Sequence, residues 1–177
     1  MSQSTDPAKF KPKTIYVTYI AATPEQVWQG LTDPAFSKQY FAGFAVDVEP
    51  KTGGTFRLLY PDGRVHIAGK VLDWSPPRRF SCSWVVEGIK EFAELPECIV
   101  TYELEPSGEA VKLTMTESHS WDIPNAILAG GQQGWPAILS GLKSLLETGK
   151  APKLEMAPPA GFVEAVKEAV ARKPWLK

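Results

Sequence analysis

The chain has 177 residues, of which 44% are hydrophobic and 22% charged, and its net charge at pH 7 is −1. That length suits one domain with a substantial core, and the balanced charge, with no basic block, argues against a nucleic-acid partner. No apolar run approaches the ~20 residues of a membrane-spanning helix, so we expect no membrane insertion.

The first segments of the chain predict a leader, a strand and two short helices. Residues 1–13 are polar and lack the apolar stretch of a secretory signal, so we expect a flexible leader. Together with just two cysteines, this favours a cytoplasmic location. The β-branched and aromatic run 14–20 ("TIYVTYI") predicts the first strand. Thr23 and Gln26 then form a capping-box pattern, and Asp33 precedes a second helix start.

Six further strands are expected between residues 44 and 116, where runs rich in β-branched and aromatic residues alternate with turn sequences. The turns are "EPKTGG", "PDG", "SPPR", "EGIKEFAELPE" and "EPSGE", in which Gly and Pro suit the backbone geometry of turns. Connections this short join neighbouring strands, so the segment is predicted to be an antiparallel meander.

Side-chain alternation predicts the two faces of this sheet, because cross-strand partners share a face. The expected partners are Val48–Phe56, Val46–Leu58, Tyr60–Val65, Leu58–Ile67, Phe56–Gly69, Val71–Cys82, Gly69–Trp84, Phe80–Val100, Cys82–Cys98, Leu104–Val111, Tyr102–Leu113 and Val100–Met115. One apolar face then passes through every hairpin. The opposite face is expected to be wet and carries Asp47, Arg57, His66, Lys70, Ser81, Ser83, Thr101, Glu103, Lys112, Thr114 and Thr116.

A helix is expected over residues 134–149, "GWPAILSGLKSLLETG", where apolar residues recur at helical spacing. Pro136 suits the first turn and Gly149 the position just past the end. This helix is expected to cover the apolar face of the sheet. Because a helix about 10–12 Å across is narrower than six strands, roughly 25–30 Å, the sheet must curl around it. The remaining space must be filled by side chains or a ligand.

Residues 151–177 are predicted to be an extension that is Pro-rich at first and then forms a short helix. Phe162, Val166, Ala169 and Val170 share one side of this helix. A helix this short needs a surface to dock on. We expect it to lie on its own domain rather than on a twin subunit.

The inward face supplies the candidate site. The cavity-lining candidates are Tyr60, Trp84, Tyr102, Met115, Glu117, His119, Trp135 and Leu139. Buried Tyr and Trp side chains need partners for their polar tips, although each of them also suits a closed core. Glu117 and His119 continue the inward parity of Met115 and would make an acid–base pair, unless the strand has already ended.

Other chemistry finds little support in the sequence. No metal-ligand spacing, Gly-rich phosphate loop or nucleophile–base set is present, so no metal, cofactor or catalytic residue is assigned. The register places Cys82 opposite Cys98, and we expect two reduced thiols rather than a disulfide.

The pieces "ATPEQVWQGLTDP", "GGTF", "GKVLDWSPPRRFSCSW", "VTYELEPSGEAVKLTMTESH" and "GWPAILSGLKSLLETG" occur in this order. They resemble the SRPBCC or START-like superfamily, in the group named after the activator of the heat-shock-protein-90 ATPase. The resemblance implies an α+β helix-grip domain over residues 14–150, with a hydrophobic cavity between the curved sheet and the closing helix. Members bind lipids, sterols, polyketides or other apolar molecules, and some are cyclases, aromatases or hydrolases.

Three functions therefore remain open. The first is binding of a small, neutral, hydrophobic molecule, because the inward face carries no charge before Glu117. The second is a cyclase-, aromatase- or hydrolase-type enzyme that uses Glu117, His119 or a tyrosine. The third is a stress- or chaperone-associated role through the exterior or the carboxy-terminal arm. The chain is expected to be a monomer or a homodimer.

Overall fold

The computed structural model describes residues 5–177. Its strands are β1 (Lys11–Ile20), β2 (Ala45–Val48), β3 (Thr55–Leu59), β4 (Val65–Ser75), β5 (Arg79–Val86), β6 (Cys98–Ser107) and β7 (Ala110–His119). Its helices are η1 (Pro7–Lys9), α1 (Pro24–Thr32), α2 (Pro34–Tyr40), α3 (Asn125–Thr148), α4 (Phe162–Arg172) and η2 (Pro174–Leu176).

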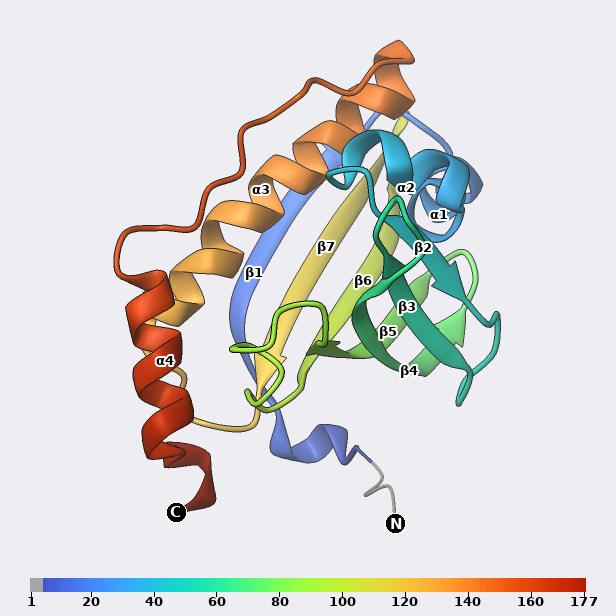
Figure 1. Ribbon diagram of the computed structural model, residues 1–177. Helices are drawn as coiled ribbons and strands as arrows, with labels where there is room; N and C mark the ends of the chain where they lie inside the picture. Colours follow the sequence, from blue (N-terminus) through green and yellow to red (C-terminus); the bar gives the residue numbers. More distant parts are fainter. Residues whose placement is uncertain (1–4) are drawn as a thin grey trace.

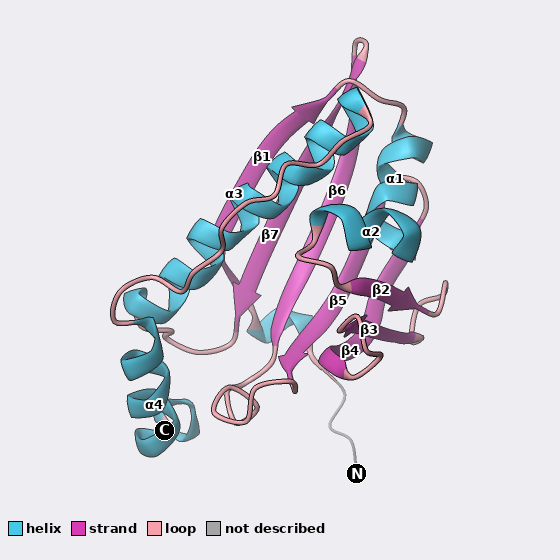
Figure 2. Ribbon diagram, turned by 45° about the horizontal axis from the view of Figure 1, so that its top comes forward, coloured by secondary structure: helices cyan, strands magenta, loops and turns pink. Residues whose placement is uncertain are grey.

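The strands form one antiparallel sheet in the order β1-β7-β6-β5-β4-β3-β2. The sheet curls around α3, with α1 and α2 beside α3 on the same face (Figures 1 and 2). The expected α+β helix-grip architecture, with six meander strands after the first strand and its two helices, is confirmed. No helix among residues 5–177 has the length and apolar character needed to cross a bilayer.

The short helices begin where their capping residues indicate. Thr23 Oγ1 accepts a hydrogen bond from the Gln26 backbone N–H at 3.2 Å, and the Gln26 side chain accepts one from Thr23 N–H at 2.9 Å. Asp33 Oδ1 likewise accepts from Ala35 N–H at 2.8 Å. These bonds satisfy N–H groups that have no partner inside the helix.

The closing helix is longer than its periodicity indicates. It spans 24 residues from Asn125 to Thr148, so Pro136 lies inside it and not in its first turn. The earlier turns contain Gly130 and Gly131, which disfavour a helix in isolation, but tertiary packing buries Ile127 and Leu128 and supports them. The predicted end is confirmed, with Gly149 in the left-handed conformation at φ 81°.

Two of the predicted strand registers are wrong by two residues. Phe80 lies opposite Tyr102 and not Val100, and Tyr102 lies opposite Met115 and not Leu113. Between β6 and β7 the cause is the hairpin, which turns tightly with Ser107 opposite Ala110. Strands β5 and β6 are joined by residues 87–97, a connection too long for its length to fix their register. An even shift leaves every side chain on its predicted face. The inward face is therefore as predicted, whereas the partners across it are not.

A bulge changes one further pair, and Val65 lies opposite Leu59 rather than Tyr60. The prediction of a wet outer face is also wrong at its centre, where Ser81, Ser83 and Thr101 are buried. There the hydroxyls of Ser81 and Thr101 hydrogen-bond each other at 2.9 Å, which satisfies them without water.

The carboxy-terminal helix α4 packs on its own chain, as expected, next to the first half of α3 (Figure 1). Val166 and Ala169 of α4 join Trp121 and Ile127 in a second apolar cluster. Phe162 lies over Gly130 of α3, where a Cβ atom would come within 2.6 Å of its ring. The chain between α3 and α4 runs back along α3 (Figure 1). This segment, residues 150–161, is called the strap below.

Candidate functional site

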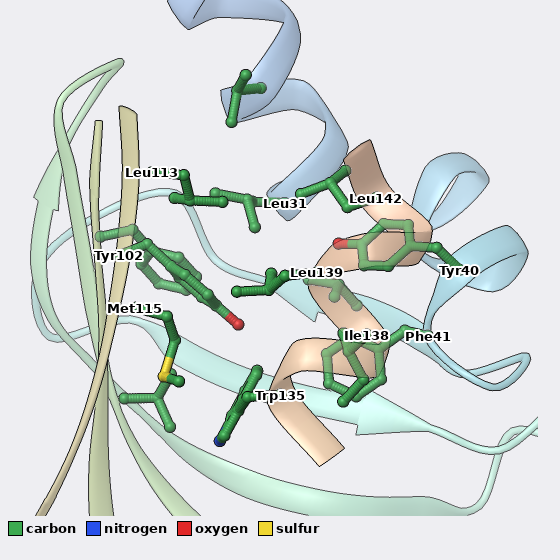
Figure 3. Close-up of a cluster of buried hydrophobic side chains, with 14 of the residues drawn as sticks. Leu31, Tyr40, Phe41, Tyr102, Leu113, Met115, Trp135, Ile138, Leu139 and Leu142 are labelled. Carbon is green, nitrogen blue, oxygen red and sulfur yellow. The ribbon is translucent and has the colours of Figure 1, made fainter. Parts of the chain in front are cut away.

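The space between the sheet and α3 contains a continuous set of aromatic rings. Trp135 of α3 is central, with its ring centroid 5.6 Å from that of Trp84, 6.0 Å from Phe41 and 6.2 Å from Tyr102. Figure 3 shows Tyr102 and Met115 side by side on the sheet and Trp135 on α3 opposite them. Edge-to-face ring packing of this kind is favourable beyond area burial. The rings therefore fill much of the space that the curled sheet leaves around the helix.

A buried polar network is embedded in this apolar interior. Glu117 Oε1 lies 2.8 Å from His119 Nε2, and Trp135 Nε1–H donates to Glu117 Oε2 at 2.7 Å. Strand β7 continues through His119, so the two residues point inward from a strand and do not lie in a loop. Both are at least nine-tenths buried. Because the Glu117 carboxylate can only accept hydrogen bonds, the donor in its contact with His119 is the N–H at Nε2.

Gly131 makes room for this network. A Cβ atom at Gly131 would lie 2.6 Å from Glu117 Oε2. The glycine that weakens the helix locally therefore lets a carboxylate approach the helix backbone. Periodicity does not reveal this role, because it depends on which strand residue faces the helix.

The candidate residues divide into an inner and an outer group. Tyr102, Met115 and Leu139 are buried in the core. Burial also raises the pKa of Tyr102 well above its usual value, so its phenol is neutral. Trp84 is partly exposed, and Tyr60 lies apart, at the rim of the sheet.

At this rim the structure corrects the prediction for His66. The residue does not face solvent; its ring stacks on Phe44 at 4.6 Å and lies 4.9 Å from Tyr60. The bulge between Leu58 and Leu59 shifts the pairing of this end of β4, so strict alternation fails there. Desolvation lowers the pKa of His66 below its usual value, which keeps the imidazole neutral.

A hollow of about 460 Å³ lies beside His66, between α3 and the strap. Its walls include Gln133 and Gly134 of α3, Met156 of the strap and Phe162 of α4. Through Phe44 and Phe41, whose centroids are 6.5 Å apart, this rim connects to the interior rings around Trp135. We call this hollow the mouth.

The remaining chemistry is limited. Among the described residues, 5–177, no three His, Cys, Asp or Glu side chains form a group that could hold a metal ion. Cys82 and Cys98 are free thiols and do not lie opposite each other, because their strand partners are Val100 and Trp84. Burial raises the pKa of both thiols, which makes them poor nucleophiles.

A curled antiparallel sheet around one long helix, with two short helices after the first strand, defines a helix-grip protein of the START-like class. The family model described as "Activator of Hsp90 ATPase homolog 1-like protein" matches residues 21–147. The chain therefore belongs to that family, and the resemblance seen in its sequence is confirmed. None of the curated proteins matches the chain.

Solved structures support the same fold. DynU16, from the dynemicin biosynthetic locus, is 28% identical over 77% of this chain and 48% of its own, with a TM-score of 0.65. This chain thus spans about half the length of DynU16. Protein MLL2253 from Mesorhizobium loti is 26% identical over 76% of this chain and 97% of its own, with a TM-score of 0.60.

PFC0360w, an HSP90 activator from Plasmodium falciparum, is 20% identical over 81% of this chain and 100% of its own, with a TM-score of 0.62. At that identity the likeness shows the fold alone. HSP90 activation is therefore not carried over to this chain.

Proposed function

We propose that the protein binds a small hydrophobic molecule between the curved sheet and α3, and that the molecule enters through the mouth. The observation that carries the proposal is the buried network of Glu117, His119 and Trp135. It sets a few polar groups inside a space otherwise lined by aromatic rings, which is the usual composition of a small-molecule site. Family membership supports the same function.

The preferred ligand is neutral and mainly apolar. The buried inner face carries no charged side chain on β7 before Glu117, and the Glu117 carboxylate is already paired with His119. A charged ligand would lose its hydration without gaining an opposite charge. A ligand hydroxyl or carbonyl near Trp135 would suit the hydrogen-bonding groups present.

Access depends on movable side chains at the rim. Trp84 and Tyr60 are partly exposed, whereas Tyr102 and Met115 are buried. The ligand would displace the partly exposed rings first. The two free thiols support the cytoplasmic location that the sequence favours.

A neutral fluorescent probe, N-phenyl-1-naphthylamine, tests the proposal together with native mass spectrometry of the purified protein. Saturable probe binding should raise Tm, since ligand at 100 times its Kd adds about 2.7 kcal/mol of stability, or roughly 5–10 °C for a chain of this size. Met156→Lys at the mouth should weaken probe binding. Leu154→Lys, on the same strap with the same 46% exposure but outside the mouth, is the matched control. No saturable probe binding and no co-purified mass would contradict the proposal.

A second candidate function is general acid–base catalysis, favoured by the 2.8 Å contact between the Glu117 carboxylate and the His119 imidazole. Any turnover found for an apolar substrate should fall by at least about a hundredfold in His119→Gln. An unchanged rate in that variant would remove His119 from the mechanism.

A further inference from the structure

A second hollow, of about 280 Å³, lies at the end of the sheet where β7 finishes. Figure 1 shows η1 and the carboxy-terminal end of the chain near this end of β7. The lining residues are Lys9, Lys11, Lys13, His119, Ser120, Trp121, Asp122, Pro174, Trp175 and Lys177. We call this hollow the basic pocket; it does not share the mouth's lining residues.

Strand pairing brings lysines to this pocket. Lys11 lies directly opposite His119 in the β1–β7 ladder. Between Pro12 and Thr14 the register shifts, so Lys13 is the extra residue of a bulge. A bulge of this kind re-aims its side chains at a sheet edge.

Positive charge exceeds negative charge in the pocket. Of its lining side chains, four are lysines and one, Asp122, is a carboxylate. The Lys13 Nζ to Asp122 Oδ1 distance is 4.0 Å, and the Asp122 side chain is fully exposed to water. Such a contact is weak, because water and salt screen it. The pocket thus retains a net positive field that attracts anions.

Two buried ring nitrogens of the same lining residues have no hydrogen-bond partner within residues 5–177. These atoms are His119 Nδ1 and Trp121 Nε1, and their residues are 7% and 8% exposed. A buried donor or acceptor without a partner costs about 1–3 kcal/mol, so each such atom calls for a partner. Since Glu117 occupies Nε2 of His119, Nδ1 is the ring nitrogen of His119 that is left without a partner, and the indole N–H of Trp121 is the unpaired donor.

We propose that the basic pocket binds a small oxyanion, a carboxylate or a phosphate group, which the lysines attract and the indole N–H of Trp121 holds beside the His119 ring. Ammonium and ring N–H groups are donors that make short, strong bonds to oxyanions. The site is separate from the proposed apolar ligand. It extends the polar network, because His119 contacts the pocket on one side and Glu117 on the other.

Nuclear magnetic resonance tests this site directly. Inorganic phosphate and sodium acetate are titrated separately, with chloride at constant ionic strength, while the Trp121 indole N–H and the His119 imidazole signals are followed. Saturable shifts confined to these signals and their neighbours are expected with one or both anions. A third arm uses vesicles of phosphatidylserine, with phosphatidylcholine vesicles as the control. Binding in the serine-lipid arm alone would assign the oxyanion to a lipid headgroup.

Two variants separate a built site from general attraction to lysine. The double variant Lys11→Gln, Lys13→Gln should weaken anion affinity by at least about tenfold. Trp121→Phe keeps an aromatic ring against Trp175, whose centroid lies 5.1 Å away, but it removes the indole N–H along with one of the two fused rings, so a loss of about three- to tenfold is expected. Lys112→Gln, on β7 beside Glu105, is the matched control and should change nothing.

The proposal is overturned if neither anion nor the vesicles give saturable shifts, or if all variants bind as the unchanged chain does. Failure here leaves the apolar-ligand proposal intact, because that experiment is read at the mouth. Failure of the neutral probe to bind likewise leaves the anion titration interpretable.

Discussion

Replacing Gly131 with Ala tests whether the buried Glu117 network has the geometry described. The new Cβ would lie 2.6 Å from Glu117 Oε2, the atom that accepts the Trp135 indole N–H. The carboxylate must therefore move, and its bond to Trp135 is lost. Gly134→Ala is the matched control on the same helix, because the nearest atom to its new Cβ, on Met156, is 3.8 Å away.

Two opposing effects determine how much each substitution changes the free energy of unfolding. Each substitution gains about 1 kcal/mol of helix propensity. Gly131→Ala also loses a hydrogen bond to a charged group, worth about 1.5–3 kcal/mol, and leaves a buried indole N–H unpaired. The net result is a destabilisation of about 1–2 kcal/mol for Gly131→Ala and a stabilisation of up to about 1 kcal/mol for Gly134→Ala. For a chain of this size the two variants should differ in Tm by roughly 5–10 °C.

Thermal unfolding followed by circular dichroism measures the difference. Repeating Gly131→Ala in a Glu117→Ala background removes the clash, so in that background the glycine substitution should become stabilising. If Gly131→Ala and Gly134→Ala raise Tm equally in the unchanged chain, Glu117 does not pack against the helix as described and the reasoning fails.

Three further outcomes are expected. Because burial raises the pKa of Cys82 and Cys98, neither should react with a thiol reagent at pH 8 in the native protein, whereas both should react in urea. The thiols of the unfolded chain lose their protons at lower pH than those of the folded chain, so the free energy of unfolding should fall as pH rises above about 8.5. A free energy of unfolding that stays constant above this pH would contradict their burial. Gly69→Ala should cost at least about 3 kcal/mol in urea unfolding, since its Cβ would lie 1.8 Å from the backbone oxygen of Ser83. Phe162→Ala should lower the free energy of local unfolding of α4 by about 2 kcal/mol, which is measured as faster amide hydrogen exchange in α4 while exchange in the sheet is unchanged. Exchange in α4 that is unchanged or slower would refute the docking role of Phe162.

The features that the sequence predicts correctly are those that depend on local interactions. Caps and turns act between residues close in the chain, so Thr23, Asp33 and Gly149 mark helix ends without tertiary information. Side-chain alternation has a period of two, which is why the inward face of β5 to β7 is predicted correctly even where Phe80 and Tyr102 have different partners.

Tertiary structure decides what depends on distant contacts. The first turns of α3 form because Ile127 and Leu128 are buried, although the adjacent glycines disfavour a helix. His66 stacks on Phe44 because a bulge shifts the strand pairing there, and strict side-chain alternation cannot predict a bulge. Likewise, Glu117 meets Trp135, and Lys11 meets His119, through packing and strand pairing between segments far apart in the chain. The sequence by itself determines which residues favour strand, helix or turn and which face they take, because those preferences are local. Only the fold determines which polar groups meet, because that depends on how the sheet closes on α3.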